Sequence, residues 1–173
     1  MRAETDRQKL EVFLAAFGDR VTGEGSIYLT GGATAVLHGW RSMTIDVDIK
    51  GDPEPPGFFE AIAILKDELD INVELASPDL FIPVLPGWRE RSLFIGRHGH
   101  LEFFHYDPYS QALAKLERGH PRDVADVSAL LEIGLIDKGQ LLDYFSAVEK
   151  ELIRFPAVDP GTFRHSVERF CAL

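Results

Sequence analysis

Apolar and polar positions in the first part of the chain predict short strands that alternate with helices. Between Thr5 and Phe17 the apolar positions recur at helical spacing, so this segment is predicted to be an amphipathic helix. Ile27–Thr30 is a short apolar run, which predicts a buried strand. The pair Gly31–Gly32 ends that strand, and Ala33–Gly39 is expected to be a short helix closed by its glycine.

A second set of predicted strands follows. Thr44–Ile49 and Ile71–Leu75 both alternate with a period of two, and in the second strand Asn72 and Glu74 are expected to share one face. A helix is expected between the two strands at Phe58–Leu69, with Phe59, Ile62, Ala63 and Leu65 as its apolar positions. Ser92–Ile95 and Leu101–Tyr106 flank a turn rich in glycine and histidine, which predicts a β-hairpin. The proline-spaced residues before this hairpin are expected to form an ordered loop.

From Asp107 onward the pattern becomes helical. Asp107-Pro108 has the residue types of a helix start, and Gly119 has that of a helix end. Four helices are expected, at about residues 108–119, 121–134, 137–153 and 159 to the end. The order of elements predicts an α/β (α+β) protein, in which helices flank a small mixed sheet. We expect this core to occupy residues 1–106 and a C-terminal helical part, residues 107–173, to pack on it.

Composition narrows the classes of protein. The net charge of −10 argues against a broad surface for nucleic acid, although six cations gather between Arg89 and Arg122. Cys171 is the only cysteine, so no internal disulfide can form, which fits a reducing compartment. No apolar run is long enough for a membrane span, and no signal peptide is recognisable at the start. We therefore expect a soluble cytoplasmic protein.

The most informative residues lie between Gly31 and Asp48. Asp46 and Asp48 alternate with apolar residues, so both carboxylates are predicted to point to one face of a strand. Such a pair repels unless a cation lies between, and an oxygen-only set suits Mg²⁺ or Mn²⁺. The backbone of Gly31 and Gly32, at a strand end where a helix opens, can approach a phosphate closely. Each feature alone is weak evidence, but together they predict a phosphate-and-metal site.

These motifs resemble those of a known superfamily. A strand, a Gly-Gly pair and then an Asp-x-Asp pair are similar to the signature of the DNA polymerase β-like nucleotidyltransferases. With Gly39, Arg41 and Thr44 added, the match resembles the AbiEii-type branch, which contains toxins of toxin–antitoxin systems. The segment Ala114–Val127 is similar to a downstream motif of that branch, which contains Lys115 and Asp126.

The resemblance implies transfer of a nucleoside monophosphate from a nucleoside triphosphate to an acceptor, with Mg²⁺. The predicted catalytic residues are then Asp46, Asp48, Glu74, Lys115 and Asp126. Glu74 is expected to be the third carboxylate, which activates the acceptor and binds metal beside Asp46 and Asp48; Glu102 is the alternative. The nucleotide is expected to contact Gly31, Gly32, Thr30, Thr34, Arg41 and Lys115. Arg41 has a second interpretation, as an ion-pair partner of Asp46, and Asp126 a second one, as a group that orients Lys115.

Several alternatives remain open at this point. The acceptor is expected to be a tRNA, a protein or a small molecule, and a cognate antitoxin is a further possible partner. If the protein contacts RNA, Trp88–Arg91 is the expected segment. Trp40 is expected to be a packing residue or a platform for a base. A different class of function, a catalytically silent module that binds nucleotides or proteins, is compatible with the same residues.

Overall fold

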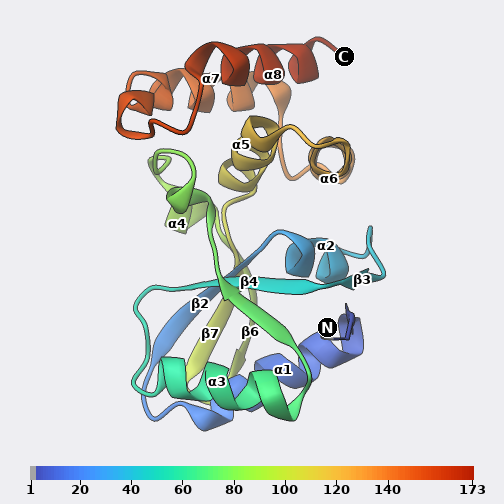
Figure 1. The fold of residues 1–173 in the computed structure, drawn as a ribbon, viewed down its shortest axis with the longest axis vertical. Coiled ribbons are helices and arrows are strands. Elements are labelled where there is room, and N and C mark those ends of the chain that lie inside the picture. Colours follow the sequence, from blue (N-terminus) through green and yellow to red (C-terminus); the bar gives the residue numbers. More distant parts are fainter. Residues whose placement is uncertain (1–2) are drawn as a thin grey trace. The chain divides into compact units, whose positions relative to one another are not determined.

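The computed structural model describes residues 3–173, which divide into two compact units (Figure 1). The first unit contains the chain up to Ser77 together with Ser92–Tyr106. The second contains Pro78–Arg91 and Asp107–Leu173. The first unit combines strands with helices and the second is helical, so the predicted α/β (α+β) class is confirmed. No helix within residues 3–173 is long and apolar enough to cross a membrane.

A mixed five-stranded sheet forms the centre of the first unit. Its strand order is β5-β4-β2-β7-β6, and the strands are β2 (Gly25–Thr30), β4 (Asp46–Gly51), β5 (Asn72–Leu75), β6 (Leu93–His98) and β7 (Leu101–His105). The pairs β2–β7 and β4–β5 are parallel, whereas β2–β4 and the predicted hairpin β6–β7 are antiparallel. A two-stranded sheet of β1 (Thr5–Asp6) and β3 (Met43–Thr44) accompanies it.

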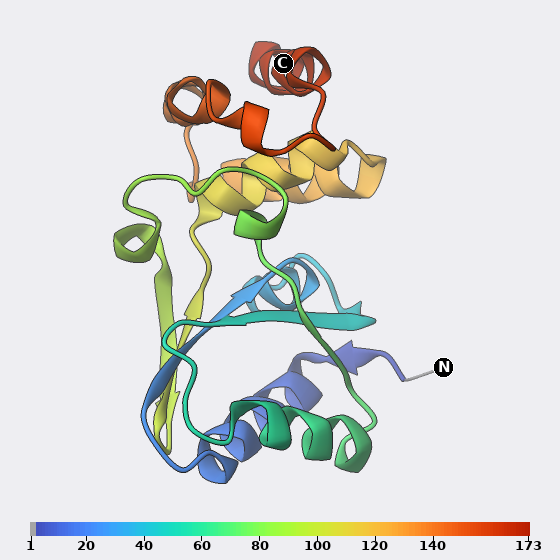
Figure 2. The ribbon, with the colours of Figure 1, turned by 60° about the vertical axis from the view of Figure 1, so that its left-hand side comes forward.

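Helices α1 (Arg7–Arg20) and α3 (Phe58–Glu68) lie side by side and cover one face of this sheet (Figures 1 and 2). Helix α1 buries Leu10, Phe13, Leu14 and Phe17, which are spaced to share one side of a helix. These side chains join Val47, Ile49 and Phe103 of the sheet in one apolar core. Because β4 turns its apolar residues toward this core, its alternate residues, the aspartates, face away from it.

Two boundaries in the first unit differ from those predicted. The expected strand Thr44–Ile49 is interrupted at Ile45, whose side chain is 55% exposed. Thr44 pairs instead with Thr5, and its hydroxyl donates a hydrogen bond to the Asp46 carbonyl at 2.9 Å. The expected first helix accordingly starts at Arg7, because residues 5–6 form a strand and Asp6 caps the helix through the Lys9 N–H.

The buried side of α3 is also shifted from the predicted one. Phe59 and Ala63 were expected on the apolar face, but Phe59 is 56% exposed and Phe58 is buried in its place. Gly57 has a positive φ and lies directly before the helix, so it sets the direction in which the first turn begins. Sequence spacing alone does not fix which of two adjacent phenylalanines enters the core.

The second unit has an apolar core of its own. Its main helices are α5 (Pro108–Arg118), α6 (Pro121–Glu132), α7 (Lys138–Glu149) and α8 (Pro160–Ala172). Three short helices join them, η1 (Pro78–Leu80), α4 (Trp88–Arg91) and η2 (Leu152–Arg154). Helix α5 packs against α6, α7 and α8. The ring centroids of Phe145 and Phe163 are 4.9 Å apart. The third predicted helix is shorter than expected, because α7 ends at Glu149 and the chain continues into η2.

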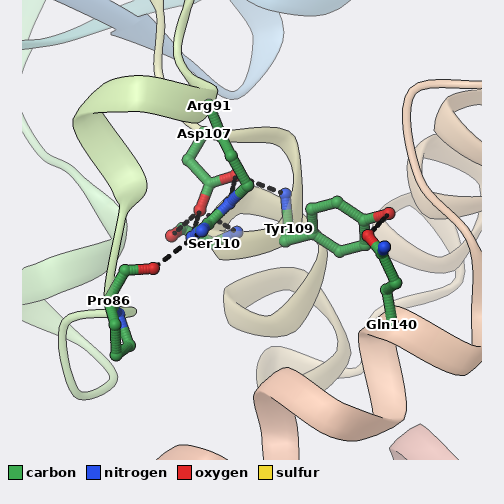
Figure 3. A network of polar contacts seen from close by, with 6 residues as sticks. All are labelled: Pro86, Arg91, Asp107, Tyr109, Ser110 and Gln140. Atoms are coloured by element: carbon green, nitrogen blue, oxygen red, sulfur yellow. Dashed lines mark hydrogen bonds and ion pairs between the residues drawn. The ribbon is translucent and has the colours of Figure 1, made fainter.

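An ion pair fixes residues 78–91 in the second unit (Figure 3). Arg91 donates to both oxygens of Asp107, at 3.0 and 2.7 Å, and to the Pro86 carbonyl at 2.7 Å. Asp107 has no exposed surface and also caps α5 by accepting from the Tyr109 and Ser110 N–H groups. The segment precedes the division that we expected at residue 106, yet its contacts join it to the helices that follow.

Candidate functional site

The turn between β2 and α2 (Gly32–His38) requires both of its glycines. Gly31 has φ 63° and ψ −130°, a backbone conformation available to glycine and strongly disfavoured for other residues. Gly32 lies against the side chain of Thr44, with no space for a Cβ. The backbone of the turn can therefore approach another group closely, which is the property expected of a phosphate-binding turn.

Asp48 lies directly beside this turn. On the paired strands, Thr30 of β2 is opposite Asp48 of β4. The position that a Cβ of residue 31 would occupy is 3.0 Å from Asp48 Oδ2. Asp46 shares this face of β4, because Val47 and Ile49 point into the core. The structure thus brings together the glycine turn and the two aspartates, as the sequence predicted.

The next strand adds two polar residues to the same face. Glu74 of β5 is opposite Asp48, and Asn72 is opposite Asp46. Asn72 Nδ2 donates hydrogen bonds to Asp46 Oδ1 and, at 3.1 Å, to Glu74 Oε1. Glu74, which we expected to be the third carboxylate, therefore lies next to the aspartate pair. The period-two pattern of the sequence placed Asn72 on the face of Glu74, but no motif marked it as a site residue.

Glu102, the alternative third carboxylate, lies elsewhere on the sheet. It is opposite Ser26 on β2, four residues before Thr30, a separation of about 13 Å along the strand. Its carboxylate pairs with Arg97 at 3.3 Å. Of the two candidates, Glu74 is thus the one that neighbours Asp46 and Asp48.

The other predicted nucleotide contacts of this unit have different surroundings. Thr30 is buried beside Asp48 at the end of β2. The Thr34 hydroxyl donates to the Leu29 carbonyl at 3.3 Å and meets His105 Nδ1 at 3.1 Å, so it is used within the protein. Arg41 is half-buried just after α2, where its backbone N–H donates to the Ala35 carbonyl. Its contact with a nucleotide stays a prediction.

A stack of rings supports α2 from the sheet. His105 and His38 stack with ring centroids 4.2 Å apart, and Trp40 stacks on His38 at 5.5 Å. Burial, and then the charge of His38, lower the pKa of His105 to about 3; burial also lowers the pKa of His38. His105 is therefore a neutral packing residue at neutral pH. This cluster was not predicted, because His105 is far from His38 and Trp40 in the sequence and the two histidines lack ligand spacing.

Lys115 and Asp126 lie in the second unit, on α5 and α6. Lys115 Nζ is 2.7 Å from Asp126 Oδ2 and 3.6 Å from Asp123 Oδ1, and both aspartates are buried. Burial raises the pKa of Asp123, but the hydrogen bonds and charge of Arg118, with the charge of Lys115, outweigh it and the pKa is lowered. The structure therefore shows the contacts of one predicted role for Asp126, to orient Lys115. A contact of either residue with nucleotide stays a prediction.

The segment expected to contact RNA is mostly engaged in packing. Arg91 is held by Asp107, and its guanidinium also lies 4.2 Å from the centroid of the Tyr144 ring. Trp88 is 6% exposed, and the Arg89 guanidinium lies over its ring at 4.5 Å. Arg89 is exposed, whereas Arg91 serves the interior of the second unit. The cationic sequence of this segment did not show which arginine would be exposed and which would be held by an ion pair.

Asp46 and Asp48 suit a hard divalent cation that takes its other ligands from phosphate and water. Within residues 3–173, no three histidine, cysteine, aspartate or glutamate side chains are grouped closely enough to hold a metal ion by themselves. Asp46 and Asp48 nevertheless offer two carboxylate ligands on one face, beside the glycine turn. Mg²⁺ commonly uses one or two carboxylates and takes its other ligands from phosphates and water. The aspartate pair fits such an ion, and a metal contact of Glu74 stays a prediction.

Comparison with known protein families gives one match. Residues 10–154 match the family described as "Nucleotidyltransferase of unknown function (DUF6036)". No curated protein and no solved structure matches the chain. The matched range contains the glycine turn, the aspartate pair, Glu74 and the Lys115–Asp126 pair, and it supports the expected nucleotidyltransferase superfamily. The AbiEii-type branch stays a prediction.

Proposed function

Since the chain belongs to this nucleotidyltransferase family, we propose that it transfers a nucleoside monophosphate from a nucleoside triphosphate to an acceptor. The observation that carries the proposal is the contact of the glycine turn with Asp48. A Cβ at residue 31 would lie 3.0 Å from Asp48 Oδ2, so a phosphate on the turn and a cation on the carboxylate would be neighbours.

The glycine turn is proposed to bind the terminal phosphates of the nucleotide. Neither Gly31 nor Gly32 has a side chain to keep an anion away, and successive backbone N–H groups in a turn attract negative charge. Thr30, at the end of the strand, is the preferred hydroxyl candidate, because the Thr34 hydroxyl already contacts Leu29 and His105. This part of the site would orient the triphosphate.

Asp46 and Asp48 are proposed to hold Mg²⁺ or Mn²⁺. When bound, the ion would offset the charge of the triphosphate and of the departing pyrophosphate. Fixed positions for the ion and the phosphates would place the α-phosphorus for attack. Positioning and electrostatic stabilisation together account for almost all the catalysis of phosphoryl-type transfer.

Glu74 is proposed to be the general base. The acceptor oxygen would form a bond to the α-phosphorus while the bond from that phosphorus to the bridging oxygen of pyrophosphate breaks. The proton of the acceptor hydroxyl would pass to the Glu74 carboxylate, which is exposed and lies opposite Asp48. A positioned base of this kind contributes about 10²–10⁴-fold to rate.

The resemblance to AbiEii-type proteins supports a narrower proposal for the acceptor and the partner. We propose a tRNA or a protein as acceptor and a cognate antitoxin as partner, with small molecules as the next acceptor class. A second candidate function is a catalytically silent module that binds nucleotide.

A transfer assay separates the two functions. The protein is incubated with each labelled nucleoside triphosphate, Mg²⁺, and total tRNA or cell lysate. We expect labelled acceptor with the wild type, loss of label in Asp46→Ala and Asp48→Ala, and a decrease of about 10²-fold or more in Glu74→Gln. Glu102→Gln is the matched control, since Glu102 lies on the same sheet but pairs with Arg97. Stabilisation by nucleotide without transfer would support the silent module instead.

A further inference from the structure

Asn72 is the only asparagine in the sequence, and its side chain lies among the carboxylates of the site. One nitrogen, Nδ2, donates both to Asp46 Oδ1 on β4 and to Glu74 Oε1 on its own strand. Both neighbours are acceptors when ionised, and the amide oxygen cannot donate, so the NH₂ group is the end that must face them. The amide thus connects two residues that would otherwise repel each other.

The registers of the strands explain why this connection is selective. Asp46 is opposite Asn72, whereas Asp48 is opposite Glu74. The amide therefore reaches one aspartate and the glutamate, whereas Asp48 lies beside Gly31. Each bridged carboxylate keeps a second oxygen that the Asn72 amide does not occupy, namely Asp46 Oδ2 and Glu74 Oε2.

We propose that Asn72 is a positioning residue of the nucleotidyl-transfer site. By bridging Asp46 Oδ1 and Glu74 Oε1, its amide sets the direction of the remaining oxygens, so that Asp46 Oδ2 turns to the nucleotide-bound cation and Glu74 Oε2 to the acceptor hydroxyl. This inference rests on the proposed function. A neutral donor is required at this position, because an aspartate would add a repelling charge and an alanine would leave the two carboxylates untied.

The role predicts a particular change in kinetics. Nucleotide contacts on the glycine turn remain in Asn72→Ala, but the carboxylates lose their fixed directions. We expect kcat to fall about 10–100-fold and KM for the nucleotide to change by less than about 3-fold, since small misplacements of reacting groups act on the chemical step. Asn72→Asp keeps the shape and loses the donor, so its kcat should fall at least as far. A fall in kcat/KM of Asn72→Ala that comes mainly from a higher KM would overturn the role. Full activity of Asn72→Asp would overturn it as well.

A spectroscopic test reports the bridge without any activity. Labelling the full chain with ¹⁵N-asparagine should give a single pair of side-chain NH₂ signals, because there is one asparagine. We expect this pair to shift in Asp46→Ala and again in Glu74→Gln. Glu60→Gln is the control, because Glu60 is exposed on α3, which packs against the opposite face of the sheet.

The two tests separate the failure of this proposal from that of the proposed function. If the NH₂ pair is indifferent to both carboxylate replacements, the bridge is absent and the Asn72 proposal fails, whatever the transfer assay shows. If the wild type transfers no nucleotide to any acceptor while the pair responds to both replacements, the proposed function fails. In that outcome the bridge is real and the positioning role in catalysis is overturned.

Discussion

Gly32 and Thr44 fit together so closely that a Cβ at residue 32 would lie 2.0 Å from Thr44 Oγ1 and 2.8 Å from Thr44 Cβ. The contact joins the start of α2 to β3, which directly precedes the aspartate strand. Thr44 in turn donates to the Asp46 carbonyl. A small residue at position 32 is therefore a condition for placing the glycine turn beside the carboxylates.

The first prediction follows from this contact. Gly32→Ala should lower the free energy of unfolding by about 1–3 kcal/mol, because the added methyl group forces Thr44 or the backbone to move. Urea unfolding measures the change. Gly161→Ala is the control, since residue 161 lies in α8 with nothing within 4 Å of an added Cβ, and alanine favours a helix. Equal stabilities of Gly32→Ala and the wild type would contradict the close fit.

A second prediction separates backbone strain from damage to the site. Gly31 and Gly39 both have positive φ, at 63° and 94°, so alanine at either should cost about 1–3 kcal/mol of stability. Only the Cβ at residue 31 approaches Asp48; at residue 39 nothing lies within 4 Å. We expect Gly31→Ala to weaken binding of nucleoside triphosphate, measured calorimetrically, and Gly39→Ala to leave it near the wild-type value. The same loss of binding in both would mean that strain, and not the approach to Asp48, is responsible.

The pH dependence of stability provides a third prediction. The pKa of His105 is about 3 in the folded protein because of burial and the charge of His38, whereas an unfolded histidine titrates near pH ~6.5. The unfolded chain thus binds one more proton between these values, so this contribution to stability is complete above pH ~6.5 and is lost as the pH falls toward 3.

Replacing His105 tests that sign. The difference in free energy of unfolding between the wild type and His105→Gln should decrease by about 1.4 kcal/mol for each pH unit below pH ~6. The measurement is a series of urea unfolding curves between pH 7 and about pH 4.5. The range stops there because most carboxylates titrate at lower pH. His100→Gln, at an exposed position, should keep the wild-type slope. A constant difference for His105→Gln would show that the buried ring does not gain a proton on unfolding.

The fourth prediction concerns the ion pair of the second unit. Arg91→Ala leaves the fully buried Asp107 without a bidentate donor and should cost about 3 kcal/mol. Arg91→Lys should recover only part of this, because a lysine cannot place two parallel donors. Trp88 lies in the same unit, so its fluorescence in a Trp40→Phe background follows this unfolding. Arg89→Ala should cost less than about 1 kcal/mol, as its guanidinium lies over an aromatic ring and is exposed; similar losses at 89 and 91 would refute the distinction.

The parts of the site that depend on local sequence were predictable. A few neighbouring residues determine the geometry of a strand that ends in two glycines. The same is true of a strand in which aspartate alternates with apolar residues. For the same reason the shared face of Asp46 and Asp48 was correct. The period of β5 also placed Glu74 and Asn72 on a common face, but it gave no partner for either.

The remaining contacts join segments that are distant along the chain. The parallel pairing of β4 with β5 decides that Asn72 meets Asp46. The parallel pairing of β2 with β7 places His105 opposite Leu29, from where it reaches Thr34 and His38. No local pattern encodes these registers. Charge was similarly ambiguous. Arg91 belongs to a cationic segment that was expected to contact RNA, but in the structure it pairs with the buried Asp107. The family match supports the nucleotidyltransferase superfamily that local motifs suggested. The contacts among the candidate site residues come from the long-range strand pairing.

The route of the chain through its two units has an evolutionary consequence. The backbone passes from one unit to the other after Ser77, Arg91 and Tyr106, so the hairpin β6–β7 is encoded between two pieces of the helical unit. Arg91 and Asp107, which bind each other, come from different pieces. A recombination event with a single breakpoint would separate residues that each unit needs. Either unit can therefore be exchanged between genes only by several coordinated breaks, and the two are expected to be inherited together.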